Sequence, residues 1–323
     1  MLPPRISFVI PCYNYGRYLR DCLDRIFAQE GGYDIEVIAV NDASPDNTID
    51  ILRSYADPRL KIIDRRENRG HVFTVNQGLA AATGKYLVRI DPDDRHHPQF
   101  LCKTVPVLEA NGQIGLAYGN IDIINDTGEV TVTSADTQHG GKDFTGNELI
   151  ALLKKNFICA PTVIARREAW MSAWPVPEGL AFNDWYFNIM LARCWTFHYC
   201  NGVLADYRVH GSNWHAKVSQ DGSEERSVLW LLNKVYAEPE TDPALEEAKQ
   251  AAKAEVYASQ YLDFATKYFG HGMNADARRC YKEAWRWCPE SFRHGAHLRL
   301  WLASFLPASV YADLKRLILR RPI

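Results

Sequence analysis

The stretch Tyr86-Leu87-Val88-Arg89-Ile90-Asp91-Pro92-Asp93-Asp94 runs from an apolar segment directly into three carboxylates. Its first five residues are mostly apolar and follow Thr83-Gly84, which is typical of a buried strand that emerges from a turn. Pro92 ends the strand because proline donates no hydrogen bond to a sheet. The three aspartates are therefore expected at the carboxyl edge of this strand, where open α/β sheets bind their ligands.

Three carboxylates so close together repel one another, and a divalent cation, nearby basic groups or solvent must offset that repulsion. An Asp-X-Asp sequence is by itself most often a solvated turn, so the surrounding sequence has to decide. A calcium loop of the EF-hand type starting at Asp91 requires glycine and glutamate where this chain has His96 and Cys102. A phosphatase with an aspartyl nucleophile would carry Asp-X-Asp after its first strand, which here ends in Pro11-Cys12-Tyr13-Asn14.

Composition indicates an ordinary globular protein. With 323 residues, of which 47% are hydrophobic, the chain can form one large domain and a smaller one. The net charge of -2 gives no reason to expect a nucleic acid as partner. The eight cysteines include no Cys-X-X-Cys pair, and no signal-peptide segment precedes the first strand, so we expect a cytoplasmic protein with buried, reduced thiols.

The first 94 residues alternate between strand and helix patterns. Apolar strands are expected at 6–10, 35–40, 60–63 and 86–90, and the helices between them at 17–29, from Ser44-Pro45-Asp46 onward, and at 71–82. Ser44, Pro45 and Asp46 read as the N-cap and the first two residues of the second helix. Right-handed crossovers then build a mainly parallel sheet whose loops gather at one edge, a common nucleotide site.

No glycine-rich phosphate loop is present, which argues against dinucleotide oxidoreductases and P-loop enzymes. Phosphate must then be bound differently. A divalent cation on Asp93 would bridge the carboxylate and a diphosphate.

Beyond residue 94 the pattern continues to about residue 215. We expect a helix at 98–111, strands at 114–118, 121–124, 129–133 and 160–165, and helices at 166–174 and 182–193. Asp184 falls in the first turn of the last helix, among aromatic residues. It is either a carboxylate favoured by the helix dipole or a partly desolvated base beside rings that can bind a sugar.

Several of these segments together resemble the family 2 glycosyltransferases, inverting nucleotide-sugar enzymes of the GT-A fold. The resemblance covers residues 5 to 215 and rests on the order and spacing of its motifs. They are Phe8-Val9-Ile10-Pro11-Cys12-Tyr13-Asn14, Val40-Asn41-Asp42-Ala43-Ser44-Pro45-Asp46-Asn47-Thr48, Asn68-Arg69-Gly70 with Asn76-Gln77-Gly78, Gly84-Lys85-Tyr86, and Asp91-Pro92-Asp93-Asp94.

The resemblance implies an α/β fold of the GT-A type, with a mixed, mainly parallel sheet and helices on both faces, over residues 1–220. It also implies a role for each motif residue. Tyr13 would stack on the base of the donor nucleotide, Asp42 would accept a hydrogen bond from its ring N–H, and Asp91 would reach the ribose. The other donor residues would be Pro11, Asn14 and Asn68.

Metal and catalytic residues follow from the same resemblance. Asp93 would ligate Mn²⁺ or Mg²⁺, and Asp184 in Asn183-Asp184-Trp185 would be the catalytic base. His210, in Asp206-Tyr207-Arg208-Val209-His210, would face the diphosphate and the metal, although alone it reads as a loop histidine. Two positions depart from the family pattern, because Asn183 and Asn41 stand where acids are more common.

The resulting functional prediction is transfer of a sugar, with a UDP-sugar as donor, to a hydroxyl of a glycan or lipid-linked acceptor in cell-surface polysaccharide synthesis. Two alternatives remain. A sugar-nucleotide nucleotidyltransferase would share the sheet but should carry a glycine- and arginine-rich loop after the first strand. A catalytically silent carbohydrate-binding or scaffold protein would keep the fold, and Asn183 is the best argument for it.

Residues 221–323 differ in character, because helical patterns replace the strands. One helix pair has tetratricopeptide-like spacing, at Ala265, Tyr268, Ala277, Tyr281, Ala284 and Pro289. A single repeat cannot form a solenoid, so packing on the catalytic domain or homodimerisation is expected. From Arg293 onward, basic residues interleave with apolar ones, which is compatible with peripheral contact to the inner face of a membrane or with a simple solvated helix face.

Overall fold

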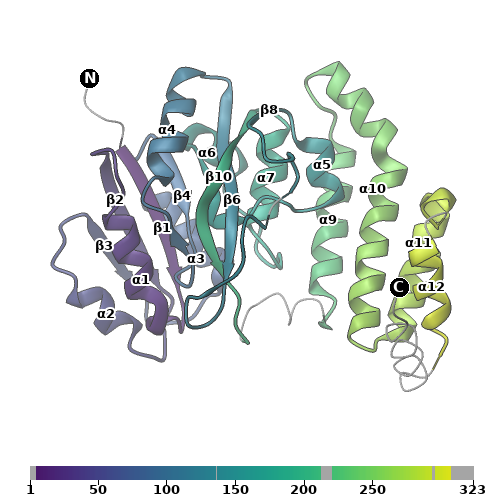
Figure 1. The fold of residues 1–323 in the computed structure, drawn as a ribbon, viewed down its shortest axis with the longest axis horizontal. Helices are drawn as coiled ribbons and strands as arrows, with labels where there is room; N and C mark the ends of the chain where they lie inside the picture. Colours follow the sequence, from purple (N-terminus) through teal and green to yellow (C-terminus); the bar gives the residue numbers. More distant parts are fainter. Residues whose placement is uncertain (1–4, 136, 212–219, 293–294, 307–323) are drawn as a thin grey trace. The chain divides into compact units, whose positions relative to one another are not determined.

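The computed structural model describes residues 5–135, 137–211, 220–292 and 295–306. The chain divides into two units, the first formed by residues 1–152 and 156–213 and the second by residues 153–155 and 214–323. The first unit is an α/β structure built around one sheet. The second is helical throughout its described part (Figure 1).

The strands of the first unit follow one another in chain order. They are β1 (Arg5–Cys12), β2 (Asp34–Asn41), β3 (Leu60–Asp64), β4 (Tyr86–Arg89), β5 (Arg95–His96), β6 (Ile114–Ile124), β7 (Val130–Val132), β8 (Phe144–Gly146), β9 (Ile164–Arg166) and β10 (Thr196–Arg208). The helices are α1 (Gly16–Phe27), α2 (Thr48–Ser54), α3 (His71–Ala81), α4 (Phe100–Ala110), α5 (Leu149–Lys154), η1 (Ala160–Thr162), α6 (Arg167–Ala173) and α7 (Asp184–Ala192).

The sheet has the spatial order β3-β2-β1-β4-β9-β6-β10-β5, with β7 paired to β6 and β8 to β10. Strands β1 to β4 are parallel, and β6 and β10 are parallel to each other. Strand β9 is antiparallel to both of its neighbours, β4 and β6. The predicted mixed, mainly parallel sheet is therefore confirmed.

Alternation along each strand sends neighbouring side chains to opposite faces of the sheet. Phe8 and Ile10 of β1 belong to one core cluster together with residues of α1, α2 and α4. Val9, between them, lies against α3 on the other face. The near-continuous apolar runs of the sequence arise because helices cover both faces (Figure 1).

The amino-terminal edge of the sheet holds a buried carboxylate, Glu36 of β2. Its Oε1 accepts hydrogen bonds from Ser7 Oγ at 2.5 Å and from the amide and hydroxyl of Thr83, both at 2.7 Å. Its Oε2 accepts from Lys61 Nζ at 2.6 Å. Gly84 completes the arrangement, because a Cβ there would lie 2.6 Å from Ser7 Oγ and 2.7 Å from Ser7 N.

Three sequence predictions about local structure were wrong. Helix α2 begins at Thr48, since the carboxylate of Asp46 accepts hydrogen bonds from the amides of Gly16 and Thr48 before the helix starts. The strands expected at 114–118 and 121–124 are one continuous strand, β6. Residues 160–165 begin as the 3₁₀ turn η1, and the strand there, β9, starts at Ile164.

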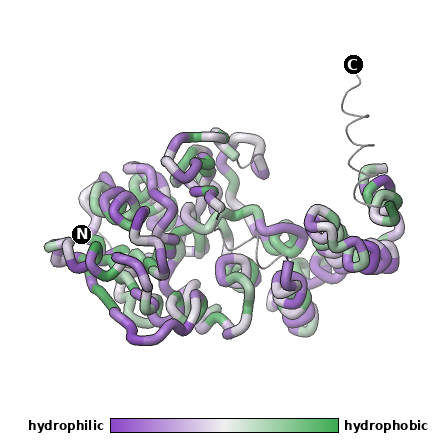
Figure 2. Tube along the Cα trace, turned by 90° about the horizontal axis from the view of Figure 1, so that it is seen from below, coloured by the Kyte–Doolittle hydropathy of each residue, from purple (hydrophilic) through white to green (hydrophobic). Residues whose placement is uncertain are grey.

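The second unit contains α9 (Ser223–Ala237), α10 (Pro243–Gly270), α11 (Asn274–Trp287), η2 (Pro289–Phe292) and α12 (Gly295–Ala303). Figure 2 shows hydrophilic and hydrophobic residues mixed within this unit. Helices α10 and α11 pack as a pair, with Ala265, Tyr268, Ala277, Tyr281 and Ala284 buried. Lys249 is fully buried but well partnered, 2.7 Å from Glu240 and 2.8 Å from Glu246.

Within the described ranges, no helix combines the length and the apolar character that crossing a lipid bilayer would require. Most of the basic C-terminal stretch, including Lys315, Arg316, Arg320 and Arg321, lies outside the described residues.

Candidate active site

The carboxyl ends of β1, β2, β3, β4 and β10, with the loops that follow them, carry all of the predicted site residues except Asp184. Pro11 lies at the end of β1, in register with Val40 of β2. Tyr13 follows it with 46% of its surface exposed, so its ring is open to solvent. Asn14 has a φ of 60°, and its amide donates to Ser44 Oγ at 3.2 Å, which fixes the turn into α1.

Asp42 is buried at the end of β2 and organises the loop that precedes α3. Its two carboxylate oxygens accept from the amides of Arg69, at 2.9 Å, and Gly70, at 2.8 Å. Arg65 lies 3.3 Å away, and Asn68 Nδ2 donates to the Asp42 carbonyl at 3.2 Å. Gly70 has a φ of 85°, which glycine adopts readily. Asp42 therefore positions the 68–70 loop, a role that the sequence did not indicate.

Asn41 explains one departure from the family pattern. Its Nδ2 donates to Asp64 Oδ1 at 2.8 Å, and its Oδ1 accepts from the amide of Ser44 at 3.2 Å. An aspartate here would place a second negative charge against Asp64, whereas the amide satisfies both partners.

Residues 91–94 form a turn closed by a hydrogen bond from the amide of Asp94 to the carbonyl of Asp91. Asp93 Oδ2 lies 3.1 Å from His210 Nε2, and both side chains are almost fully buried. Burial first, and then the charge of Asp91, raise the pKa of Asp93 to about 6, although His210 acts in the opposite direction. Asp93 and His210, 117 residues apart in sequence, are thus brought into direct contact.

Asp94 is buried and only partly satisfied. Its Oδ1 accepts from the amide of Arg208 at 2.9 Å, but its Oδ2 is buried without a hydrogen-bond partner among the described residues. Burial and the charges of Asp93 and Asp91 raise its pKa well above the usual range. A nearby cation would stabilise the charged form of a carboxylate that is buried and only partly hydrogen-bonded.

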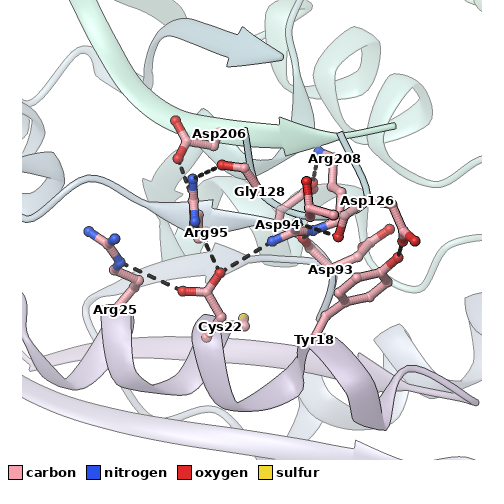
Figure 3. A network of polar contacts seen from close by, with 12 residues as sticks. Tyr18, Cys22, Arg25, Asp93, Asp94, Arg95, Asp126, Gly128, Asp206 and Arg208 are labelled. Carbon is pink, nitrogen blue, oxygen red and sulfur yellow. Dashed lines mark hydrogen bonds and ion pairs between the residues drawn. The ribbon is translucent and has the colours of Figure 1, made fainter. Parts of the chain in front are cut away.

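Arg208 of β10 holds the turn in place (Figure 3). Besides its amide bond to Asp94, its Nε donates to the Asp93 carbonyl at 2.8 Å. Its Nη1 donates to the carbonyls of Asn125 and Asp126, and its guanidinium lies 4.6 Å from the ring centre of Tyr18. The Tyr18 hydroxyl in turn donates to the Asp126 carboxylate. Arg208 therefore joins β10, the β6–β7 turn and α1 around the predicted metal ligands.

A second buried arginine, Arg89 of β4, contacts Asp91. Its Nη2 donates to Asp91 Oδ1 and, at 3.0 Å, to His71 Nε2. Because arginine cannot accept, His71 Nε2 must be the acceptor, and the imidazole is neutral with its proton on Nδ1. Partial removal from water and the charge of Arg89 lower the pKa of His71, which the carboxylates of Asp91, Asp184 and Asp42 oppose. His71 thus lies among three of the predicted site carboxylates.

Asp184 is the first residue of α7, preceded by the buried N-cap residue Asn183. Asn156 Nδ2 donates to Asp184 Oδ2 at 3.0 Å. Trp185 Nε1 donates to the Leu152 carbonyl at 2.8 Å, which fixes the start of the helix. Asp184 and Arg89 line the same small cavity, so Arg89 lies between Asp91 and Asp184.

A separate group, His97, Asp122 and Asp206, has ligand atoms close enough to hold a metal ion. Asp206 is however already paired with Arg95 at 2.5 Å and with His97 at 2.7 Å. Burial opposes its charge, but these two partners outweigh burial and lower the pKa of Asp206. Figure 3 shows the contact between Asp206 and Arg95. Because its own neighbours neutralise Asp206, we regard this group as an ion-pair network.

The structure thus gathers Asp42 and Asn68 around one loop, Asp91 and Asp184 around Arg89, and Asp93 with His210. Sequence reasoning missed Arg89, His71 and Arg208 as members of the site. Arg89 carried a usable signal, since a charge inside an otherwise apolar strand must find partners when it is buried.

Comparison with known proteins shows which proteins this chain resembles in sequence and in structure. An uncharacterized glycosyltransferase of Nostoc sp. is 29% identical over 287 residues, which cover 85% of this chain and 80% of that protein. The structure is similar to a mannosyltransferase of Pyrobaculum calidifontis in complex with GDP-Man and Mn²⁺, with a TM-score of 0.60, 18% identity, and coverage of 99% and 89% of the two chains. It is also similar to S. aureus TarS 1-349 in complex with UDP-GlcNAc, with a TM-score of 0.56, 15% identity, and coverage of 90% and 92%.

These structural likenesses establish the fold. The model of the Glycosyl transferase family 2 family matches residues 7–173, which contain every motif from β1 to the Asp91–Asp94 turn. The chain belongs to glycosyltransferase family 2, and its first unit has the GT-A fold.

Proposed function

We propose that this glycosyltransferase is metal-dependent and inverting, and that it moves a sugar from a UDP-sugar to a hydroxyl of a glycan or lipid-linked acceptor in cell-surface polysaccharide synthesis. The observation that supports this most is the position of Arg89. It contacts Asp91, at the predicted donor site, and shares a cavity with Asp184, the predicted base. The predicted donor site and the predicted base thus both adjoin the guanidinium of Arg89, which supports a single site for the two substrates.

The donor nucleotide would lie across the ends of β1, β2 and β4. The exposed ring of Tyr13 offers a surface on which a base can stack, and Asp91 would reach the ribose. Asp42 uses its oxygens for the 68–70 loop, so its contact with the ring N–H of uracil would use a remaining lone pair. Pro11, Asn14 and Asn68 would shape the pocket around these three residues.

Asp93 and His210 would hold the metal. A buried carboxylate and an imidazole in contact form a donor set that suits Mn²⁺, and Mg²⁺ less well because it prefers oxygen alone. The raised pKa of Asp93 and the unpartnered Oδ2 of Asp94 both fit a site whose negative charge a cation offsets. Bound there, Mn²⁺ would neutralise the charge that develops on the departing diphosphate.

Asp184 would act as the base. An acceptor hydroxyl is a weak nucleophile at neutral pH, so a carboxylate must take its proton as the oxygen attacks the anomeric carbon. The new glycosidic bond forms as the bond to the diphosphate breaks, and UDP leaves. Attack opposite the leaving group inverts the configuration. A single base suffices, unlike the paired acids of glycoside hydrolysis.

A lipid-linked acceptor would bring the enzyme to a membrane surface. Leu298, Leu302 and Phe305 are exposed at positions three and four residues apart around α12, and the sequence continues into a basic stretch. Sedimentation with vesicles that contain anionic phospholipid tests this contact, and unchanged sedimentation after Leu302→Asp and Phe305→Asp would contradict it.

A panel of nucleotide sugars with Mn²⁺ tests the proposed activity. We expect release of UDP from at least one UDP-sugar, strictly dependent on metal, and tighter binding of UDP than of GDP or dTDP in calorimetry. Binding of GDP more tightly than of both pyrimidine nucleotides would contradict the uracil assignment. Binding of donors with no turnover in the presence of any acceptor would instead favour the catalytically silent alternative.

A further inference from the structure

Between β4 and α7 lies a cavity of about 10 Å³. It is lined by Arg89, Ala160, Val163, Trp170, Asp184 and Asn188. This is about the room that a single water molecule needs, provided that polar groups surround it.

Two of the lining residues carry buried donors that are unused among the described residues. They are Nε of Arg89 and Nδ2 of Asn188, and Asn188 is only 2% exposed. Nearly all buried donors in folded proteins have a partner, which is often an ordered water. Two such donors on one cavity of water size indicate an occupant that accepts hydrogen bonds.

The third polar residue of the cavity is an acceptor. Asp184 stands one helical turn before Asn188 on α7, so the two side chains share a face of the helix. Asn156 occupies one position on Asp184 Oδ2, which leaves the carboxylate with further lone pairs. A water molecule can accept from both unused donors and donate to this carboxylate, which satisfies all three groups at once.

We propose that one resident water occupies this cavity and bridges Arg89 Nε and Asn188 Nδ2 to the carboxylate of Asp184. Arg89 and Asn188 are then positioning residues for the base, an inference that rests on the proposed role of Asp184. Nη2 of Arg89 contacts Asp91 and His71, so the same guanidinium would position groups on both the donor side and the acceptor side of the site. The water takes no part in the proton transfer, since the acceptor proton goes to Asp184 itself.

The charges around the cavity suit this arrangement. Burial opposes the charge of Arg89, but the carboxylates of Asp91, Asp184 and Asp94 outweigh it, and the pKa of Arg89 stays above its usual value. Arg89 is therefore a permanent donor, and the orientation of the water is fixed toward Asp184.

Two pairs of variants test the proposal. Asn188→Leu keeps the number and branching of the non-hydrogen side-chain atoms but has no donor, while Asn188→Ser keeps a hydroxyl that can donate. Val163→Ile adds a methylene to the cavity and leaves every polar group in place. Val105→Ile adds the same group in α4, outside the cavity, and serves as its control.

We expect Asn188→Leu and Val163→Ile to lower kcat by roughly 10- to 100-fold, because a base displaced by a fraction of an ångström loses alignment. The KM for the donor and the affinity for UDP should not change. Asn188→Ser and Val105→Ile should keep kcat within about threefold of the wild type. A high-resolution crystal structure should place the water within about 3.2 Å of both nitrogens and of the carboxylate.

A wild-type crystal structure with an empty cavity would overturn the proposal, and so would unchanged kcat in Val163→Ile once the water has been displaced. These results differ from a failure of the proposed function. If no donor supports turnover, or if Asp184→Asn retains full activity, the base assignment fails whether or not the water is present.

Discussion

Buried carboxylates at the two ends of the sheet have pKa values shifted in opposite directions. At the amino-terminal edge, burial would raise the pKa of Glu36, but hydrogen bonds from Lys61, Ser7 and Thr83 outweigh it and lower the pKa to about 2. At the carboxyl edge, burial and mutual repulsion raise the pKa of Asp93 to about 6. Asp94 there keeps an unpartnered oxygen among the described residues.

Under the proposed function, this difference distinguishes a carboxylate that stabilises the fold from carboxylates that bind a metal. Glu36 needs no ligand, because both of its carboxylate oxygens already accept hydrogen bonds from Ser7, Lys61 or Thr83. Asp93 and Asp94 repel each other and Asp91, at a cost in stability that a bound cation would reduce. We therefore propose that buried carboxylates stabilise the fold at the amino-terminal edge and take part in the reaction at the carboxyl edge.

The largest expected effect is on activity at the carboxyl edge. Asp93→Ala should abolish transfer, because it removes the proposed metal ligand, while the melting temperature stays the same or rises. Initial rates with a UDP-sugar and Mn²⁺, together with thermal unfolding, measure both. Full activity in this variant would show that Asp93 is no ligand.

Asp184→Asn should lower kcat by roughly 10²- to 10⁴-fold with little change in donor affinity, since a base acts only in the transition state. The replacement keeps the size of the side chain and can keep the contact with Asn156. Weaker UDP binding with intact turnover would make Asp184 a donor-site or structural residue, and the base would then have to be sought elsewhere.

Glu36→Gln should leave kcat within about twofold and reduce the free energy of unfolding by about 1 to 3 kcal/mol, as expected when a buried hydrogen-bonded network loses its charge. Chemical denaturation at pH 7 measures the change.

The effect of Glu36→Gln on the free energy of unfolding should depend on pH. The folded pKa of Glu36 is depressed, so its stabilisation is present above the ordinary value of 4.5 and is lost as the pH falls toward about 2. The difference in stability between wild type and Glu36→Gln should shrink across that window. A constant difference would mean that the charge of Glu36 contributes nothing.

Asp94→Asn should give the smallest effect, a rise of a few degrees in melting temperature without metal. The amide removes one repelling charge and keeps an oxygen for the amide of Arg208. A lower melting temperature in differential scanning calorimetry would show that the Asp94 charge is already compensated.

The sequence predicted the features that depend on neighbouring residues, and it missed those that depend on partners distant in the sequence. The strands, and the edge at which Asp42, Asp91 and Asp93 lie, followed from apolar runs and from prolines that end them. The start of α2 did not, because Asp46 is drawn to the amide of Gly16, 30 residues away. Asn76 in the Asn76-Gln77-Gly78 motif shows the same limit, since its side chain bonds both the amide and the carbonyl of Val176.

The roles of the buried arginines lay beyond the sequence for a related reason. Arg208 is 115 residues from Asp93, and Arg89 meets Asp184 only after β4 and α7 have packed. Sequence patterns report which face of a strand is buried, but not which distant partner will neutralise a charge on it. The family resemblance named the carboxylates, and the structure was needed to find the cations that organise them.

Calorimetric titration of UDP into wild type, Asp93→Ala and Glu36→Gln, each with and without Mn²⁺, tests the contrast between the two edges most directly. We predict metal-dependent binding of equal affinity in wild type and Glu36→Gln, and loss of the metal-dependent part in Asp93→Ala. Equal binding by all three proteins, or binding that does not depend on Mn²⁺ in the wild type, would contradict the assignment of the carboxyl edge as a metal-assisted donor site.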